Sequence, residues 1–282
     1  MAMSTYAAIS AYVNPIFERS MSVAYEANLM AQLVTNYSST GWMTRNVPVY
    51  PTFTAQQVAE TDDISNPQDF NKSTLATFTP QEFALQVLIS DRRIETDPEN
   101  AQNDAIRHIG LAMANKIDTD LCSEFSNLSS GKGTAGSVLA IVNVSAGIAK
   151  LRTATKMTGV NNIVLHPYQW HDIWLELGQP QANKAFLGDT ANEALRNYAV
   201  GDMLDGQWYT SGNVSGGGGG TCYGGVFRQE SIALDTRRGY RLEPERDASK
   251  RGLELNATMG YDTGVLRSDY GVYLLSDASE PS

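Results

Sequence analysis

The sequence predicts an α+β fold in which a long helix, a long extended segment and a strand-rich C-terminus surround a mixed α/β section. Three observations lead to this prediction. One apolar stripe at helical spacing follows Asp97-Pro98, the stretch from Trp42 to Asp97 shows no helical spacing, and apolar residues alternate through much of the last 45 residues. The chain has 282 residues, which is enough for one large domain or two that pack closely together.

The composition excludes a disordered chain and disfavours general binding to nucleic acid. Hydrophobic residues make up 42% of the chain and charged residues only 18%, whereas charged residues are typically about 25%. Lysine and arginine number 21 against 31 acidic residues, so the net charge is −10. Any contact with a polynucleotide must therefore be local or indirect.

The cysteines and the N-terminus indicate where the protein resides. Cys122 and Cys222 lie 100 residues apart with no CxxC motif, which is typical of a reducing compartment. No segment offers the roughly 20 mostly apolar residues that a membrane-spanning helix needs. The chain carries no lysine or arginine before Arg19 and so lacks the positive start of a signal peptide. We therefore expect a soluble protein that these signals do not export.

The first predicted helix begins after Asn14-Pro15. Asparagine is a good N-cap, and proline at the first helical position has no amide hydrogen that needs a partner. We expect an amphipathic helix that runs to about Tyr37 and is ended by Gly41. Its apolar residues recur at three- and four-residue spacing: Ile16, Phe17, Val23, Ala24, Ala27, Met30, Ala31, Val34 and Tyr37.

The segment from Trp42 to Asp97 is predicted to be a long hairpin-like excursion. Its first extended arm contains Pro48 and Pro51, which exclude a central strand position. A polar, turn-rich stretch follows over residues 60–73, and a second extended run covers residues 75–89. Connections of over 50 residues without a helix are unusual, since about 4–6 residues is normal. We expect such an arm to pack on another chain.

A long helix is predicted over Asp97 to Leu128, with Asp97 as the cap and Pro98 at the first helical position. At 1.5 Å per residue it would be roughly 45 Å long, about the diameter of the whole domain. Gly131 and Gly133 stop it. Its apolar stripe consists of Ile106, Ile109, Met113, Ile117, Leu121, Phe125 and Leu128.

Mixed helix and strand patterns follow. Residues 146–157 look helical, residues 162–166 read as a buried strand, and a short helix is expected after Pro167. A further helix is predicted from a capping box at Thr190 to Gly201, and Asp205-Gly206 is a hairpin turn signal. The five glycines of residues 216–220 form a loop. Residues 253–261 alternate, and residues 272–275 form a short buried strand.

No catalytic, metal or nucleotide motif is complete in this sequence, so no cofactor is predicted. The stretch Gly131-Lys132-Gly133-Thr134 fails the P-loop pattern, because Gly133 follows the lysine and position 126 is serine. His166 and His171 lie about 140° apart on a helix, so they do not converge on a metal. Ser129 to Lys132 matches SxxK without the partner motifs. Asp118 and Asp120 lie on different faces of their helix.

Basic residues concentrate near the C-terminus. Between Arg228 and Arg251 there are seven basic residues against five acids, with alternating signs. Two interpretations stay open: a solvated strand-and-turn face, or a subunit contact in which interleaved charges set the register. The residues of this interface charge cluster are Arg237, Arg238, Arg241, Arg246 and Arg251.

Four ordered stretches resemble the major capsid proteins of tailed bacteriophages, which have the Hong Kong 97-type fold. The capped helix from Asp97 to Leu128 resembles the spine helix of the family, and NIVLHPYQWHDIWLEL (162–177) resembles its strand–proline–helix step. VGDMLDGQWYTSGNV (200–214) resembles its glycine–hairpin–serine segment, and residues 245–275 resemble its closing strands. The resemblance spans nearly the whole chain.

This resemblance implies a division of the chain into named parts. Residues 1–41 would be an N-terminal arm, residues 42–96 the extended E-loop over an adjacent subunit, and residues 97–178 and 231–282 the peripheral P-domain. Residues 179–230 would be the axial A-domain, whose loop between Gly216 and Gly220 would surround the five- and six-fold axes. The E-loop tip would carry Asn66, Pro67 and Lys72.

The resemblance also implies a function and partners. The chain would be a structural, non-enzymatic major capsid protein that assembles through pentamers and hexamers into an icosahedral shell around phage DNA. It would enclose that DNA without sequence-specific binding, contact no membrane and assemble in the host cytoplasm. A separate scaffolding protein and a portal would be its other partners, because the predicted arm helix begins within about fifteen residues of Met1.

Two alternatives and one modification are left open. An encapsulin-like compartment would share the fold, although its E-loop is typically shorter. An enzyme on an α/β core would need convergent polar residues. Some relatives crosslink an E-loop lysine to a neighbouring asparagine, and Lys72 lies near the predicted tip, but no asparagine partner or acid catalyst can be assigned.

Overall fold

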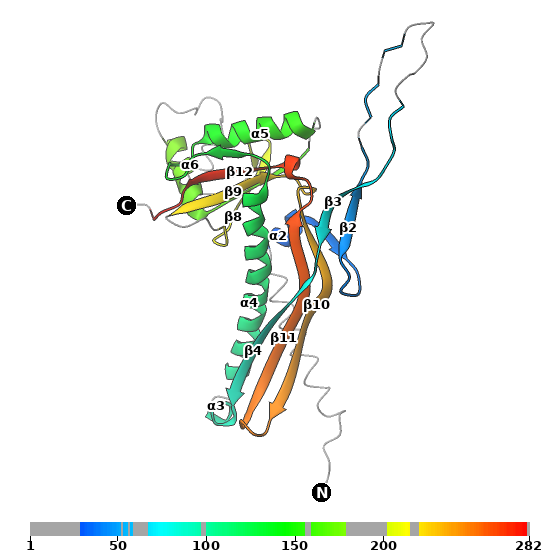
Figure 1. The fold of residues 1–282 in the computed structure, drawn as a ribbon. Helices are drawn as coiled ribbons and strands as arrows, with labels where there is room; N and C mark the ends of the chain where they lie inside the picture. Colours follow the sequence, from blue (N-terminus) through cyan, green and yellow to red (C-terminus); the bar gives the residue numbers. More distant parts are fainter. Residues whose placement is uncertain are drawn as a thin grey trace.

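The computed structural model describes residues 29–51, 53–55, 57–58, 67–96, 100–155, 159–178, 202–214 and 220–280. Figure 1 shows three parts: a rounded upper body with α5 and α6, an elongated lower body along α4, and a hairpin that points away from both. The elongated body and the upper body each contain a sheet of their own.

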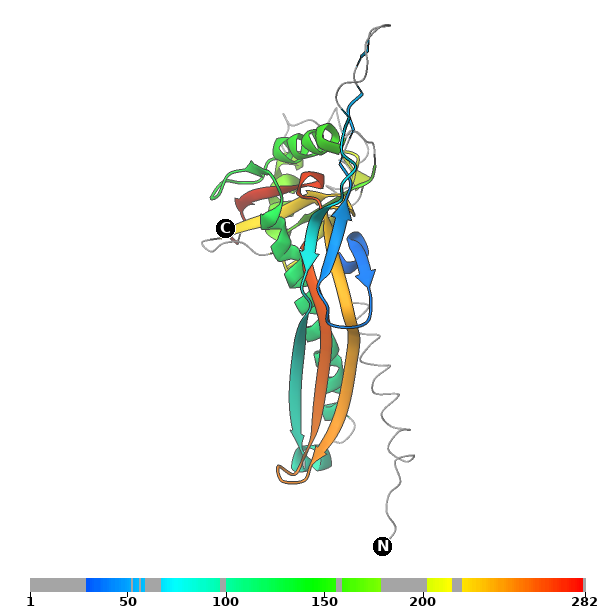
Figure 2. The same cartoon turned by 45° about the vertical axis from the view of Figure 1, so that its right-hand side comes forward.

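The elongated body is a four-stranded sheet with the order β1-β10-β11-β4. The strand β1 (Thr35–Ser38) runs parallel to β10 (Ile232–Asp247), whereas β11 (Gly252–Val265) runs antiparallel to both β10 and β4 (Gln81–Ser90). The helix α4 (Asn100–Ser123) lies along one face of this sheet, as Figure 2 shows. With 24 residues it is about 36 Å long.

Alternation along β11 explains why this sheet packs on α4. Strand side chains point to opposite faces in turn, and Leu255, Ala257 and Met259 all belong to the buried set. They share one hydrophobic cluster with Ile109 and Met113 of α4. The opposite face stays largely exposed along β4, whereas at the start of β10 it is covered by Phe78, which packs on Ala233.

The upper body is a six-stranded sheet with the order β5-β12-β9-β6-β8-β7. Its helices are α5 (Ile141–Thr155) and α6 (Pro167–Gly178). Ile163 and Leu165 of the central strand, Trp170 of α6 and Leu151 of α5 are fully or almost fully buried in one core. The strands are β5 (Gly131–Gly133), β6 (Asn161–Leu165), β7 (Asp202–Met203), β8 (Gly206–Thr210), β9 (Thr221–Phe227) and β12 (Gly271–Asp277).

The hairpin consists of β2 (Arg45–Val49) and β3 (Ser73–Phe78), which pair only with each other. The register shifts between Val47 and Pro48, as expected for a proline that cannot donate to the ladder. The other short elements are α2 (Met30–Leu33), α3 (Asp91–Thr96), η1 (Glu124–Asn127) and η2 (Ser268–Tyr270).

The prediction for the N-terminal helix is wrong at its C-terminal end. The helix α2 ends at Leu33 rather than Tyr37, and residues 35–38 form β1. The strand gains backbone hydrogen bonds to β10, which the helical pattern of Val34 and Tyr37 could not reveal. The part of the prediction before residue 29 lies outside the described residues.

The predicted second arm of the excursion, residues 75–89, is confirmed only in its first part, where residues 73–78 form β3 of the hairpin. Residues 81–90 do not project with the hairpin but form β4 of the long sheet, and residues 91–96 are helical. The long helix ends at Ser123 and continues as the short 3-10 helix η1, so it is shorter than predicted. The turn near Asp205-Gly206 is centred one residue earlier, on Leu204 and Asp205, which both have positive φ.

The helix, the strand and the second helix predicted over residues 146–177 are all present in the upper body. The strand β6 and the helix α6 lie where predicted, and α5 begins five residues earlier than expected. The helix predicted from Thr190 to Gly201 lies outside the described residues. Residue 178, where the expected P-domain and A-domain meet, lies between β6 and β8 in the chain, and these two strands pair with each other.

Candidate assembly surfaces

The hairpin carries an exposed group of aromatic side chains. Beyond β2 and β3 its two legs are joined by Gln68, which both accepts from the Thr54 N–H (3.0 Å) and donates to the Thr54 carbonyl (2.6 Å). Tyr50 and Phe70 stack with 4.7 Å between ring centroids, and Phe53 stacks on Phe70 at 5.7 Å. We call Tyr50, Phe53 and Phe70 the aromatic patch.

The aromatic patch is unusual because large apolar rings normally lie in a core. Tyr50 is 46% exposed, Phe53 55% and Phe70 64%. A contiguous exposed apolar surface on a projecting element marks an interaction site. The Lys72 ammonium lies 5.3 Å from the centre of the Tyr50 ring, a cation–π contact that adds a positive charge to the patch.

The predicted tip residues fall partly on this patch. Pro67 and Lys72 are exposed residues of the hairpin, and Lys72 borders the aromatic patch directly. Asn66 lies outside the described residues. The sequence could have pointed to the patch through Phe70, a large apolar residue within the polar, turn-rich stretch of residues 60–73.

The interface charge cluster is largely neutralised within the chain. Arg238 contacts Glu82 at 2.7 Å, Arg246 forms a bidentate pair with Asp91 at 2.9 and 3.2 Å, and Arg241 pairs with Glu243. Arg237 pairs with Asp235 at 2.8 Å, and Arg251 lies in the turn that joins β10 to β11. Arg238 joins β10 to β4 and Arg246 joins β10 to the helix that begins at Asp91, whereas Arg237 and Arg241 pair within β10. Because all these partners lie in the same chain, the contacts favour the interpretation as a strand face.

Asp118 fixes the start of the described chain to α4. Its side chain is only 2% exposed, and its two oxygens accept the backbone N–H groups of Leu29 (3.3 Å) and Met30 (3.1 Å). Burial raises the pKa of Asp118, and the two hydrogen bonds oppose that rise. Burial, with the nearby Asp118 charge, also raises the pKa of Cys122 to about 12. This thiol is therefore a packing group and not a nucleophile.

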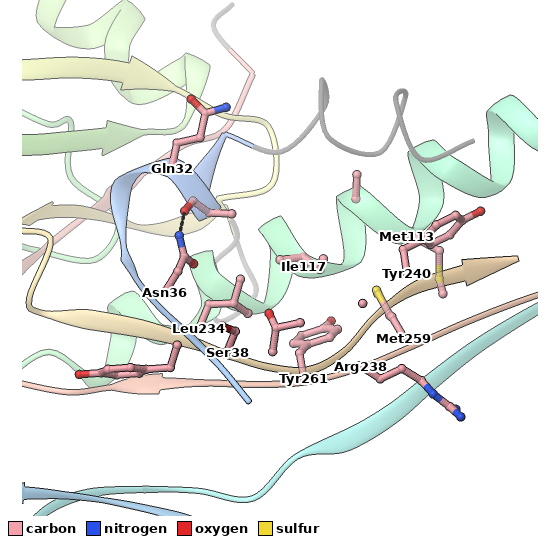
Figure 3. Close-up of a pocket in the computed structure, with 15 residues that line it drawn as sticks. Gln32, Asn36, Ser38, Met113, Ile117, Leu234, Arg238, Tyr240, Met259 and Tyr261 are labelled. Atoms are coloured by element: carbon pink, nitrogen blue, oxygen red, sulfur yellow. Dashed lines mark hydrogen bonds between the residues drawn. The ribbon is translucent and has the colours of Figure 1, made fainter. Parts of the chain in front are cut away.

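An apolar pocket of about 400 Å³ lies next to this attachment point. Figure 3 shows its lining of Met113 and Ile117 from α4, Met259 and Tyr261 from β11, and Tyr240 from β10. The Asn36 amide donates to the Ala31 carbonyl (2.7 Å) and closes the turn between α2 and β1 at its edge. The lining offers apolar surface for packing and few groups for chemistry.

The histidines do not form a reactive site. The His166 Nδ1 accepts the Tyr168 N–H at 3.2 Å, and burial lowers the pKa of His166. His171 stacks on Trp174, with 5.9 Å between the rings. Within the described ranges no group of three histidine, cysteine or acidic residues could hold a metal ion. Lys132 lies in β5, an edge strand beside β12, and not at the start of a helix.

The loop of residues 216–220 is described only at Gly220. Its φ of +83° is in the left-handed region that favours glycine, and its carbonyl accepts the Ala278 N–H at 2.6 Å. Gly216 lies outside the described residues. None of the helices in the described part of the chain is long and apolar enough to span a membrane.

Comparisons with known proteins agree with this arrangement. Residues 74–275, well over half of the chain, match the family described as phage capsid protein. A search of curated proteins found no significant match.

Solved structures of phage capsids are similar in fold. The capsid structure of the cyanophage P-SCSP1u aligns with a TM-score of 0.68 and 13% identity, covering 90% of this chain and 89% of that chain. The head structure of the Helicobacter pylori bacteriophage KHP40 aligns with a TM-score of 0.70 and 11% identity, covering 90% and 91%. The structure of Mycobacterium phage Che8 aligns with a TM-score of 0.68 and 15% identity, covering 82% of this chain and 84% of that chain.

These similarities agree with a molecule whose described features are exposed contact surfaces, such as the aromatic patch, and not a pocket lined by reactive groups. A capsid protein is a structural component of the virion, and its copies associate with one another. The long helix, the mixed α+β architecture and the projecting hairpin agree with the Hong Kong 97-type fold of tailed-phage capsids. The chain belongs to the phage capsid protein family and is a major capsid protein of the phage head.

Proposed function

We propose that copies of this chain assemble through pentamers and hexamers into an icosahedral shell that encloses phage DNA, and that each hairpin lies on a neighbouring subunit. The observation that carries this proposal is the aromatic patch. Three stacked rings on a projecting hairpin are about half exposed in one chain, and burying apolar area stabilises by roughly 25 cal/mol per Å². A second copy offers the surface to bury them.

The same reasoning supports a division of labour between the parts. The upper body has a complete core, so we propose that it packs as a rigid unit around the symmetry axes, with the loop at residues 216–220 nearest to them. We also propose that the N-terminal arm (1–41) and the hairpin form the main contacts between subunits. Interfaces of obligate assemblies bury roughly 2,000 Å² and above, and extended arms are an economical way to reach this area.

The net charge supports the proposed relation to DNA. A net charge of −10 suits a shell whose lining does not grip the packed polyanion, so we expect the shell to enclose DNA without sequence-specific binding. Assembly in the host cytoplasm with a separate scaffolding protein and a portal completes the proposal. Crosslinking through Lys72 is not part of it, because neither an asparagine partner nor an acid catalyst can be assigned to this lysine.

An encapsulin-like compartment is the second candidate, since it shares the fold. The match over residues 74–275 to phage capsid proteins favours the phage head. The length of the hairpin favours it too, because the legs continue well beyond β2 and β3.

The proposal is tested by Phe70→Ala, matched with Val160→Ala on the upper body, since both side chains are 64% exposed. We expect both purified subunits to keep their unfolding free energy within about 0.5 kcal/mol, as exposed sites usually do. Only Phe70→Ala should reduce shell yield in co-expression with the phage scaffold, counted by electron microscopy.

Normal shells from Phe70→Ala would contradict the role of the aromatic patch. Equal losses of shell yield from the two variants would contradict it as well, because any exposed apolar truncation would then suffice.

A further inference from the structure

The two legs of the hairpin are each held at the root by a different aspartate of the long sheet. Asp235 of β10 and Asp262 of β11 lie directly opposite each other in the antiparallel register. Arg45 begins β2, and Thr79 follows the end of β3. Arg45 contacts Asp235 and Thr79 contacts Asp262, so the two carboxylates each hold one leg.

The Asp235 contact is a buried ionic group of three side chains. Asp235 is fully buried, and the Arg45 Nε lies 3.2 Å from its Oδ1. Its Oδ2 accepts from the Arg237 guanidinium at 2.8 and 2.9 Å. Arg237 also donates to the Ser39 hydroxyl, in the segment that leads from β1 to the hairpin. The entry to the hairpin is therefore held by two arginines around one carboxylate.

Arg45 is further restricted by its other contacts. Its guanidinium lies 5.1 Å from the centre of the Tyr37 ring and donates to the Ser38 carbonyl at 3.4 Å. A planar guanidinium that stacks and donates in fixed directions leaves few alternative orientations for the residue that carries it.

The Asp262 contact holds the exit. Its Oδ2 accepts the Thr79 N–H at 2.6 Å, and its Oδ1 accepts the Thr263 N–H at 3.0 Å. Burial raises the pKa of Asp262, and the Asp235 charge adds to this rise. Two like charges opposite each other on neighbouring strands repel, so the pair costs stability unless each finds its partner.

Apolar packing fills the space between the two legs. Phe78, the residue that pairs with Arg45 across the hairpin, is 1% exposed and packs with Ala233 and Leu266. The Tyr37 ring lies 6.4 Å from it. This small core is a separate hydrophobic cluster from the cores of the two bodies.

We propose that Asp235 and Asp262 act as a two-carboxylate clamp that sets the direction in which the hairpin leaves the body, and thereby selects the geometry of the shell. This proposal rests on the proposed function of the hairpin as an intersubunit arm. Both aspartates are positioning residues, because they act on the neighbouring subunit only through the hairpin.

The geometry of a lever explains why the root matters. From Arg45 to Phe53 the leg spans eight residues, or about 26 Å at roughly 3.3 Å per residue. A tilt of about 10° at the root moves the aromatic patch by about 5 Å, which exceeds the 4.0–4.5 Å at which apolar atoms touch. Small changes at the clamp therefore decide whether the patch meets its neighbour.

A buried ionic group adds little net stability, because removing its charges from water costs about as much free energy as their attraction returns. Replacing such a group by apolar side chains of similar size is often neutral or stabilising, whereas removal of one partner leaves an uncompensated charge. The clamp is therefore best tested by replacing all three side chains together, Arg45→Met, Asp235→Leu and Arg237→Met. The matched control is Arg246→Ala with Asp91→Ala, an ion pair that joins the far end of β10 to the first residue of α3.

The direct readout is the orientation of the hairpin in full-length, unassembled subunits. Spin labels at Ala55→Cys on the hairpin and Lys150→Cys on α5 report one distance distribution. The native Cys122 and Cys222 are buried, so we expect the label to react with the two introduced cysteines. We expect a narrow distribution in the parent and in the control, and a distribution at least twice as wide in the triple variant. Shells from the triple variant should be mixed in size, with an unchanged unfolding midpoint.

An unchanged, narrow distribution in the folded triple variant would overturn the clamp. If that variant fails to fold, Asp262→Ala decides in its place, because it removes only the acceptor of Thr79. A broader distance distribution in Asp262→Ala would support the clamp, and an unchanged distribution in this variant would overturn the clamp. The spin-label result does not depend on assembly, so it stays separate from the Phe70→Ala test of the proposed function.

Discussion

The upper body and the hairpin both carry large aromatic side chains but bury them differently. In the upper body every residue of β6 is buried, and Trp170 lies against Trp208 with 5.7 Å between the rings. In the hairpin, Tyr50, Phe53 and Phe70 stack just as closely but remain about half exposed. One region is complete within a single chain, whereas the other needs a neighbour.

The elongated body lies between these two extremes. Its sheet is covered by α4 on one face, while β4 alternates between half-buried and exposed residues. This difference indicates that the upper body contributes mainly to the stability of the subunit, and the hairpin mainly to association between subunits. Truncations in the upper body should then affect folding, and truncations towards the hairpin should affect association.

The largest expected effect is in the upper body. Trp170→Ala removes a side chain that is 2% exposed, and large-to-small core substitutions of this kind cost about 3–5 kcal/mol. Urea unfolding of the purified subunit measures this loss. Leu175→Ala on the same helix, where the side chain is 48% exposed, is the control and should change stability by less than about 0.5 kcal/mol. Similar losses from the two variants would remove the contrast between the regions.

An intermediate effect is expected where the described chain joins α4. Asp118→Ala leaves the N–H groups of Leu29 and Met30 without their acceptor, at a cost of about 1–3 kcal/mol. The loss should be local, so hydrogen exchange of these two amides should accelerate more than exchange in β6. Asp104→Ala, at an exposed position of the same helix, should leave both amides protected. Uniform acceleration across the subunit would show that Asp118 supports the whole fold instead.

The smallest expected effect is at the turn that joins β10 to β11. Asp247 accepts from the Ser249 hydroxyl (2.6 Å) and from the backbone of Ser249 and Lys250, which lowers the pKa of Asp247 to about 2. Because the folded pKa lies below the usual value of about 4, the contribution to stability is present above pH 4. It is lost as the pH falls through about 2.

Carboxyl NMR of the intact subunit measures this titration directly. Asp247→Asn should remove that signal and leave the raised pKa of Asp262 in place. Titration of Asp247 at the usual value of about 4 would show that the turn is not held by these hydrogen bonds.

Several elements follow from local patterns and are predictable for that reason. The strand β6 is a short apolar run before Pro167, and α6 has an apolar face at helical spacing. The alternation of Leu255, Ala257 and Met259 defines both the strand β11 and its buried face. In each case the signal lies within about a dozen residues, so it does not depend on what the element packs against.

The place of β4 and the role of Asp118 are not predictable in this way. Alternation in residues 83–89 fits an arm that projects as well as a strand inside a sheet, because both have a period of two. Asp118 looks like an ordinary helical acid until α2, which begins 88 residues earlier in the chain, brings Met30 to it. The clamp likewise joins residues from three strands and a connection.

The sequence by itself determined the α+β class, the long helix, the main strands and the absence of any strong catalytic motif, since these depend on composition and on patterns between near neighbours. Tertiary structure alone decided which strands share a sheet, where each core ends and how the hairpin is held at its root. Pairing between distant segments and the burial of charge depend on contacts across the chain, and local periodicity carries no record of them.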